Sequence, residues 1–278
     1  MQPTIRPGRR EDVESIAPWT QTTFSWGDYI PERMPVWLDD DTSEVLVCVD
    51  EHDEPIALAH VTLLSPTEAW IEGARVHPDH RRKGLGTALN HAGVEWASAR
   101  GGRVMRLTTE ADNAAARAQV VGLGYREVSR WVYGALEVDP LHRASEQYRL
   151  RRAPGSDAEA AWLFWAASDL ARVGRELIAI GWQWRTARPD DVTQLGELLQ
   201  SPAGWISLEQ PEEDWIRTLW FATTPEGLLP LFDGLLDLAA ARGVTEIDVK
   251  LPNLGWTAEA ITRFGGEPKE VLVYAKAI

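Results

Sequence analysis

The sequence predicts an α/β fold, a mixed β-sheet with helices on both faces, and it predicts that the chain carries this fold twice. Segments with the two-residue alternation of strands are separated along the chain by segments with helical periodicity. The chain also repeats itself: residues 5–19 resemble 150–164 at an offset of 145, and residues 99–107 resemble 241–249 at an offset of 142. So steady an offset indicates two copies of one domain.

The expected domains are residues 1–140 and 146–278, joined near "EVDPLHRASEQ" (137–147). Another stretch, "WRTARPDDVTQLGELL" (184–199), also resembles the start of a repeat. A domain that began there would have too few residues, so we interpret 184–199 as an inner helix of the second copy.

The first copy opens with a strand at 3–7 and a helix at 10–18 that acidic residues cap. Residues 24–39 are rich in aromatic side chains and are expected to be irregular or short-helical. The apolar runs 44–50 and 55–64 flank the turn "EHDEP", which favours a hairpin, and 68–77 is expected to be the next strand.

Helix and strand then alternate. Leu85, Leu89 and Trp96 form one apolar stripe on a helix at 84–100, which Gly101 and Gly102 end. The remaining predicted elements are a strand at 103–109, a helix at 112–122 and closing strands at 125–136.

The charge of the chain is acidic and evenly spread. The net charge is −14 over 278 residues, with 15 basic and 22 acidic groups in residues 1–144 and 13 and 20 in residues 145–278. Each half therefore carries −7, which argues against nucleic-acid binding and favours a solvated acidic surface or a cationic substrate.

Cysteine and histidine give no sign of a disulfide or a metal site. Cys48 is the only cysteine and lies in an apolar strand, where we expect it to be buried. His77 and His80 span a proline turn without an evident third ligand. With no signal segment and no membrane-spanning run, the expected location is the cytoplasm.

The segment "ARVHPDHRRKGLGTAL" (74–89) joins a strand to a helix through a glycine-containing turn. Such a turn directs backbone N–H groups and the positive end of the helix dipole at one point. Arg81, Arg82 and Lys83 add cationic donors there, so an anionic ligand, most naturally a diphosphate, is indicated. The P-loop pattern is absent, and Leu89 stands where a dinucleotide-binding fingerprint needs a third small residue.

This segment resembles the coenzyme A loop of the GCN5-related N-acetyltransferases (GNAT), whose pattern is Gln/Arg-x-x-Gly-x-Gly/Ala, here residues 81–86. "DNAAARAQVVGLGY" (112–125) resembles a second segment of that family, with Asn113, Gly124 and Tyr125 in register. The resemblance implies two tandem GNAT domains and acetyl-CoA as the co-substrate, with no metal.

The resemblance also assigns roles. Backbone groups at Val76 and His77 are expected to pair with the pantetheine arm, and those near Val76 to stabilise the oxyanion. Asn113 is expected to contact the pantetheine, and Glu72 to remove the proton of the acceptor amine. The diphosphate is expected to be held by Arg81, Arg82, Lys83, Gly84, Leu85, Gly86 and Thr87.

The family's general acid is a tyrosine, but the corresponding residue here is Val120, so the thiolate must take its proton from another group or from water. The region between the first two helices lines the acceptor pocket in the family. In this sequence that region offers Phe24, Trp26, Asp28 and Tyr29, which suits an amine flanked by apolar or ring structure.

The second copy lacks these features. At the loop it reads "TTPEGLLPLF" (223–232), in which Glu226 replaces Gly84, Pro225 removes an amide donor and the cations are missing. Gly255 replaces Asn113. We therefore expect this half not to bind coenzyme A.

Fourteen tryptophans are present, eight of them after residue 145. Pairs such as Trp162/Trp165 and Trp182/Trp184 could line a pocket or cage a cation, but most tryptophans are expected to pack in the core.

The sequence therefore predicts an N-acetyltransferase, a monomer or homodimer, that acts on a small-molecule primary amine. Two alternatives remain open at this stage: a protein or peptide N-acetyltransferase, and a non-catalytic acyl-CoA-binding module.

Overall fold

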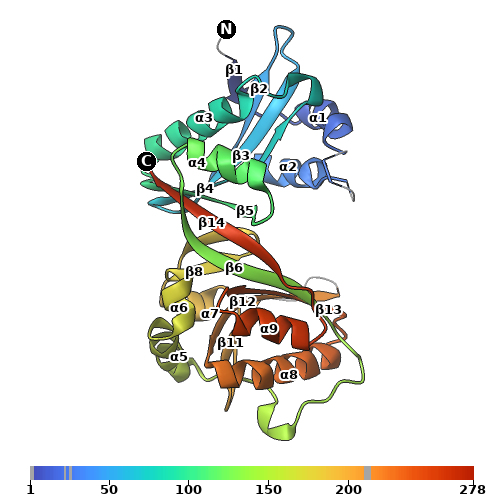
Figure 1. Ribbon diagram of the computed structural model, residues 1–278, viewed down its shortest axis with the longest axis vertical. Coiled ribbons are helices and arrows are strands. Elements are labelled where there is room, and N and C mark those ends of the chain that lie inside the picture. The colour runs from blue at the N-terminus through green and yellow to red at the C-terminus, as the bar shows by residue number, and fades with distance from the viewer. Residues whose placement is uncertain (1–2, 22, 25–26, 210–213) are drawn as a thin grey trace. The chain divides into compact units, whose positions relative to one another are not determined.

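The computed structural model describes residues 3–21, 23–24, 27–209 and 214–278 (Figure 1). It divides into two compact units. The first consists of the chain up to Leu107 together with 118–126 and 275–278, and the second of 108–117 and 127–274. Each unit therefore includes short segments that lie apart from its main part in the sequence. The predicted domain boundary between 140 and 146 stays a prediction.

The first unit begins with a four-stranded antiparallel sheet. Its strands are β1 (Thr4–Pro7), β2 (Ser43–Val49), β3 (Pro55–Ser65) and β4 (Glu68–Val76), each paired with the next. Two helices, α1 (Asp12–Thr20) and α2 (Ile30–Leu38), lie between β1 and β2 in the chain. The short helix predicted as one possibility within 24–39 is therefore present.

Helices cover both faces of this sheet because alternate residues of β2 point to opposite sides. Val45 and Val47 pack with residues of α1 and α2. Leu46, between them, approaches Gly93 of α3 (Leu85–Ala99). Cys48 is buried, as predicted.

The fifth strand, β5 (Val104–Glu110), runs parallel to β4 over only three pairs, from Glu68↔Val104 to Trp70↔Arg106. The rest of β4 has no ladder with β5, so one edge of the strand is left open after Trp70. Helix α4 (Ala114–Gly122) follows β5 in the chain.

The second unit has the same order of elements. Its principal strands are β7 (Arg151–Arg152), β10 (Glu197–Ser201), β11 (Gly204–Leu208), β12 (Trp215–Thr223) and β13 (Glu246–Pro252). β7 pairs antiparallel with β10 as β1 pairs with β2, and β12 and β13 run parallel over three pairs, from Trp215↔Glu246 to Arg217↔Asp248. The predicted α/β fold with two copies of one domain is therefore confirmed.

The helices of this unit follow the same plan. α5 (Ala158–Ala166) and α6 (Asp169–Gly174) come after β7, and α8 (Pro225–Ala241) connects β12 to β13. α9 (Trp256–Arg263) packs beside α8 over the sheet (Figure 1). The chain ends in β14 (Lys269–Ala277).

Residues 184–199 are not an inner helix, so that interpretation was wrong. They contain most of β9 (Gln183–Thr186), which pairs with β8 (Leu177–Ile180), then the short helix α7 (Asp191–Gln194) and the start of β10.

The resemblance of this stretch to the chain's beginning has a local cause. In both places an arginine on a strand binds an aspartate in the next helix through two hydrogen bonds, at 2.8 and 2.8 Å for Arg6 and Asp12 and at 2.8 and 2.6 Å for Arg185 and Asp191. The motif fixes a strand–turn–helix corner, and this corner was mistaken for evidence of a helix through 199.

Residues 125–136 do not form several closing strands. They form one strand, β6 (Arg126–Glu137), which pairs antiparallel with β13 from Glu246↔Glu137 to Pro252↔Trp131. The last strand of the first copy therefore completes the sheet of the second unit. In the described part of the chain, no helix is long and apolar enough to span a membrane.

Candidate active site

The turn before α3 has an open helix end. Gly84 is the N-cap residue and has φ +79°, and Arg82 also has positive φ, at +61°. A left-handed conformation at Gly84 favours glycine, although a Cβ there would meet no atom within 4 Å. No side chain among the described residues caps the helix, and its first backbone bond runs from Ala88 N–H to the Gly84 carbonyl. The N–H groups of the first turn before Ala88 therefore have no acceptor within the helix and are available to an external one.

Three cations stand at this helix end. Arg81, Arg82 and Lys83 are exposed, and none of them forms an ion pair with a residue that the structure describes. Elsewhere the arginines are commonly paired, as Arg6 is with Asp12 and Asp53. Cations without such partners, beside open N–H groups, make a site that can accept an anion such as a diphosphate.

The open edge of β4 presents Val76. His77 donates its backbone N–H to the Ile56 carbonyl at 2.9 Å, and Val76 is opposite Ala57. Because pairs alternate in an antiparallel ladder, the N–H and C=O of Val76 point away from β3. Val76 can therefore pair with an extended ligand as a further strand would, whereas the N–H of His77 is already used.

A β-bulge interrupts β4 one residue after Glu72. The register with β3 shifts between Leu58↔Arg75 and His60↔Glu72, and Gly73 has φ +67°. The extra residue of a bulge leaves the ladder. Backbone groups at Gly73 and Ala74 thus join those of Val76 as candidates to polarise a carbonyl.

Glu72 is paired with a histidine that the sequence analysis did not single out. The Nδ1 atom of His60 lies 3.2 Å from Oε1 of Glu72, and the His60 ring stacks on Trp37 with centroids 4.2 Å apart. The tight hairpin at Pro66 and Thr67 would by itself set His60 opposite Gly73, and an irregularity between Leu63 and Ser65 shifts the register so that His60 is opposite Glu72. The sequence does not show this shift.

The predicted acceptor residues surround a cation of the chain itself. Arg75 binds Asp28 through Nε at 2.6 Å and Nη2 at 3.1 Å. Its guanidinium carbon lies 5.1 Å from the ring centroid of Phe24 and 5.2 Å from that of Tyr29. Trp26 lies outside the described residues. Asp28, Phe24 and Tyr29 therefore lie together around Arg75, and their place in an acceptor pocket stays a prediction.

The electrostatics of this cluster follow from burial and from Arg75. Burial alone raises the pKa of Asp28, but hydrogen bonds donated by Arg75 and Thr23 outweigh it and hold this pKa below the ordinary aspartate value. Burial also raises the pKa of Tyr29, an effect that Arg75 opposes and the nearby Glu72 carboxylate strengthens. Tyr29 therefore stays a neutral phenol that faces both groups.

The tyrosine after α4 is a structural residue. Tyr125 is buried and accepts a hydrogen bond from Nδ2 of Asn90 at 2.9 Å. Burial raises its pKa to about 12, although this hydrogen bond opposes the rise. Val120, at the position of the family's acid, is also buried. Asn113 belongs to the other unit, where its Oδ1 accepts the N–H of Ala116 at 3.0 Å, so its predicted cofactor contact stays a prediction.

The second copy closes the corresponding helix end with its own side chain. Thr224 is the N-cap of α8, and its hydroxyl accepts the N–H of Gly227 at 3.2 Å. Pro225 occupies the first turn, and Glu226 adds a negative charge there. Counted from the first parallel pair of each copy, Glu72 of β4 corresponds to Leu219 of β12, which is buried.

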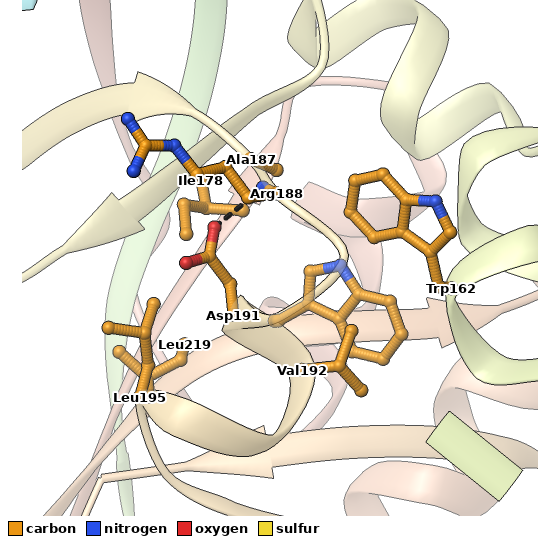
Figure 2. Close-up of a pocket in the computed structure, with 9 residues that line it drawn as sticks. Trp162, Ile178, Ala187, Arg188, Asp191, Val192, Leu195 and Leu219 are labelled. Carbon is orange, nitrogen blue, oxygen red and sulfur yellow. Dashed lines mark hydrogen bonds between the residues drawn. The ribbon is translucent and has the colours of Figure 1, made fainter. Parts of the chain in front are cut away.

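Most tryptophans of the second unit lie in its core or pack against it, as expected. Trp165, Trp184 and Trp220 are buried. Trp162 and Asp191 both line a largely apolar hollow, in which the Asp191 carboxylate turns toward Arg188 and accepts its backbone N–H at 2.6 Å (Figure 2).

One ring of this unit also contacts a cation of the chain. The Nζ of buried Lys250 lies 4.8 Å from the Trp182 ring centroid and pairs with Asp248. Burial lowers the pKa of Lys250, against the effect of Asp248.

The profile described as the Acetyltransferase (GNAT) family matches residues 13–125. A curated histidine N-acetyltransferase from Oreochromis niloticus is 34% identical over 80 residues, which are 28% of this chain and 23% of that protein. The chain thus matches about a quarter of that relative's length.

Solved structures are similar over the whole chain. A GCN5-related N-acetyltransferase from Sphaerobacter thermophilus has a TM-score of 0.66 at 19% identity and covers 99% of this chain and 96% of its own. The tandem GNAT protein from the clavulanic acid biosynthesis pathway has a TM-score of 0.60 at 14% identity, covering 99% and 98%. At such identities the likeness shows the fold, which is that of tandem GNAT proteins.

Proposed function

This chain belongs to the GNAT acetyltransferase family through its residues 13–125, and on that premise we propose that it transfers an acetyl group from acetyl-CoA to the primary amine of a small molecule. The observation that carries the proposal is the open end of α3, where glycine-turn N–H groups lie together with three cations that pair with no described residue. An acetyl-CoA diphosphate matches this end in charge and in hydrogen-bonding capacity.

The cofactor half of the site consists of the turn and the open edge of β4. Arg81, Arg82 and Lys83, with the amides of 84–87, would hold the diphosphate. The backbone of Val76 would pair with the pantetheine arm, as an added strand pairs with a sheet edge. We also propose that Asn113 contacts the pantetheine arm.

The reaction needs a neutral amine, because an alkyl ammonium has a pKa of about 10.4 and no free electron pair. Glu72 would take the proton from the amine, directly or through a water. The nitrogen then attacks the thioester carbonyl carbon, and backbone N–H groups at the bulge and at Val76 would stabilise the oxyanion. As the carbon–sulfur bond breaks, the nitrogen gives up its second proton to water and the amide is formed. The thiolate takes a proton from water, since Val120 offers none, so the two transfers balance.

Phe24, Asp28 and Tyr29 support a small acceptor with ring or apolar groups. Asp28 already binds Arg75, so we propose that the carboxylate fixes Arg75 and the rings rather than pairing with the amine itself. The name of the histidine N-acetyltransferase relative refers to a small amine-bearing molecule, which agrees with this acceptor class.

The test is thiol release from acetyl-CoA, measured with a panel of small primary amines and, separately, with peptides. We expect release with one or more small amines and none with peptides. Release with peptides alone would contradict the acceptor class. Tight acetyl-CoA binding without release in either panel would contradict the enzymatic proposal and favour a binding module.

A further inference from the structure

His60 is a buried histidine beside the proposed base. It lies on β3, and its side chain is only 2% exposed. Its ring lies flat on Trp37 of α2, with an interplanar angle of 4°. Burying a polar ring costs free energy unless its nitrogen atoms form hydrogen bonds.

The two ring nitrogens of His60 have different surroundings. Nδ1 lies 3.2 Å from Oε1 of Glu72. Nε2 is buried and has no hydrogen-bond partner among the residues that the structure describes. An ionised carboxylate only accepts, so the contact is a hydrogen bond when the ring hydrogen is on Nδ1. The opposite tautomer would set two lone pairs against each other and leave a buried N–H without an acceptor.

The contact fixes Glu72 next to the bulge. The Trp37 indole stacks on the His60 ring. The same indole is so close to Gly73 that a Cβ on this residue would lie 3.1 Å from it. Trp37 therefore packs against both the histidine and the bulged backbone. Trp37 thereby positions both His60, which contacts the Glu72 carboxylate, and the backbone amides of the bulge at Gly73.

We propose that His60 is a positioning residue, which donates a hydrogen bond from Nδ1 to Glu72 and holds this carboxylate in the orientation that removes the amine proton. The inference rests on the proposed function, because it takes Glu72 as the base. A carboxylate without this donor could turn away from the amine, and misplacement of a reacting group by about 1 Å can cost about 100-fold in rate.

Two substitutions separate the hydrogen bond from the packing. His60→Phe keeps a flat ring on Trp37 and removes the donor, whereas His60→Asn loses the stacked ring and keeps an N–H donor near the position of Nδ1. With the most active amine, we expect His60→Phe to lower kcat about 10- to 100-fold and to leave the Kd for acetyl-CoA within twofold. We expect His60→Asn to recover most of the loss. Unchanged kcat in His60→Phe, or an equal loss in a folded His60→Asn, would overturn the proposal.

A second readout does not depend on turnover. In the ¹⁵N-labelled full-length protein, the imidazole signals that disappear in His60→Asn belong to His60. We expect them to report hydrogen on Nδ1 and to change in Glu72→Ala. Hydrogen on Nε2 and none on Nδ1 would overturn the positioning role even in an active enzyme. Hydrogen on Nδ1 in a protein that acetylates no amine would contradict the proposed function instead, and the positioning role with it.

Discussion

The helices α3 and α8 occupy the same place in two copies of one fold, yet their N-terminal ends have opposite chemistry. The end of α3 begins with a left-handed glycine, has no side-chain cap in the described residues and is preceded by three cations that pair with none of them. The end of α8 is capped by Thr224 and carries Pro225 and Glu226. One end is open to an anion, and the other is satisfied by its own chain.

The strands before these helices differ in the same sense. β4 and β12 each run parallel to their neighbour for three pairs and then leave it. After that point β4 carries Glu72, paired with His60, whereas β12 carries the buried Leu219. The comparison teaches that the fold preserves the splayed strands in both copies, while the chemistry depends on a few residues at the splay and at the turn.

The largest effect is expected at the strand. Glu72→Gln removes the proposed base and keeps the size of the side chain, so kcat should fall about 100- to 10,000-fold. The Kd for acetyl-CoA should not change, because Glu72 lies outside the turn that binds it. Leu219→Met, at the corresponding position of β12, is the control and should leave kcat within twofold. A similar loss of kcat in both variants would contradict the proposal that catalysis depends on the first copy alone.

The next effect is expected at the glycine turn. Gly84→Asp places a carboxylate where the diphosphate is proposed to bind, and we expect acetyl-CoA binding to weaken by about 2 to 3 kcal/mol, roughly 30- to 150-fold. Gly243 also has a left-handed φ, at +72°, and open space around it. Gly243→Asp therefore imposes similar backbone strain outside the site, and its calorimetric Kd should equal that of the unchanged chain. Equal weakening in the two variants would assign the effect to strain.

The cations should contribute less. Replacing Arg81, Arg82 and Lys83 together by alanine should weaken acetyl-CoA binding by about 1 to 2 kcal/mol, since exposed charges are screened by water and salt. The Kd measured at several salt concentrations should also become less salt-dependent. Arg172→Ala, which removes an exposed arginine from the second unit, is the control. Unchanged affinity in the triple variant would exclude these side chains from the diphosphate site.

The smallest effect is expected at the capped helix. Thr224→Ala removes a side-chain cap, which typically stabilises a helix by about 1 kcal/mol. The thermal midpoint should drop by a few degrees, with acetyl-CoA affinity and stoichiometry unchanged. Appearance of a second acetyl-CoA site in this variant would mean that the cap, rather than the lost cations and glycine, is what closes the second copy.

Much of the fold could be predicted because its signals are local. The glycine turn, the hairpin at 44–64 and the long helix after Gly84 depend on neighbours in sequence, and the structure has them. The inner helix at 184–199 was mistaken because Arg185 and Asp191 repeat a corner motif, which does not determine the structure of the residues after the corner. The pairing of β6 with β13 was missed because strand partners distant in sequence leave no local pattern.

The site divides in the same way. The residues of the turn were visible in the sequence because they form a compact motif, and Glu72 was assigned through the family resemblance that this motif carries. Arg75 was not, since its role comes from Asp28 and from two rings brought to it by the fold. The partnership of His60 with Glu72 depends on the register shift between Leu63 and Ser65, which no local pattern in the sequence shows.

The measurement that decides between an asymmetric and a symmetric pair of copies is a calorimetric titration of the full chain with acetyl-CoA, read for stoichiometry. One molecule bound per chain, with affinity reduced roughly 30- to 150-fold in Gly84→Asp and unchanged in Thr224→Ala, is the predicted result. Two molecules per chain, or one whose affinity is unchanged in Gly84→Asp, would contradict the assignment of acetyl-CoA to the open end of α3.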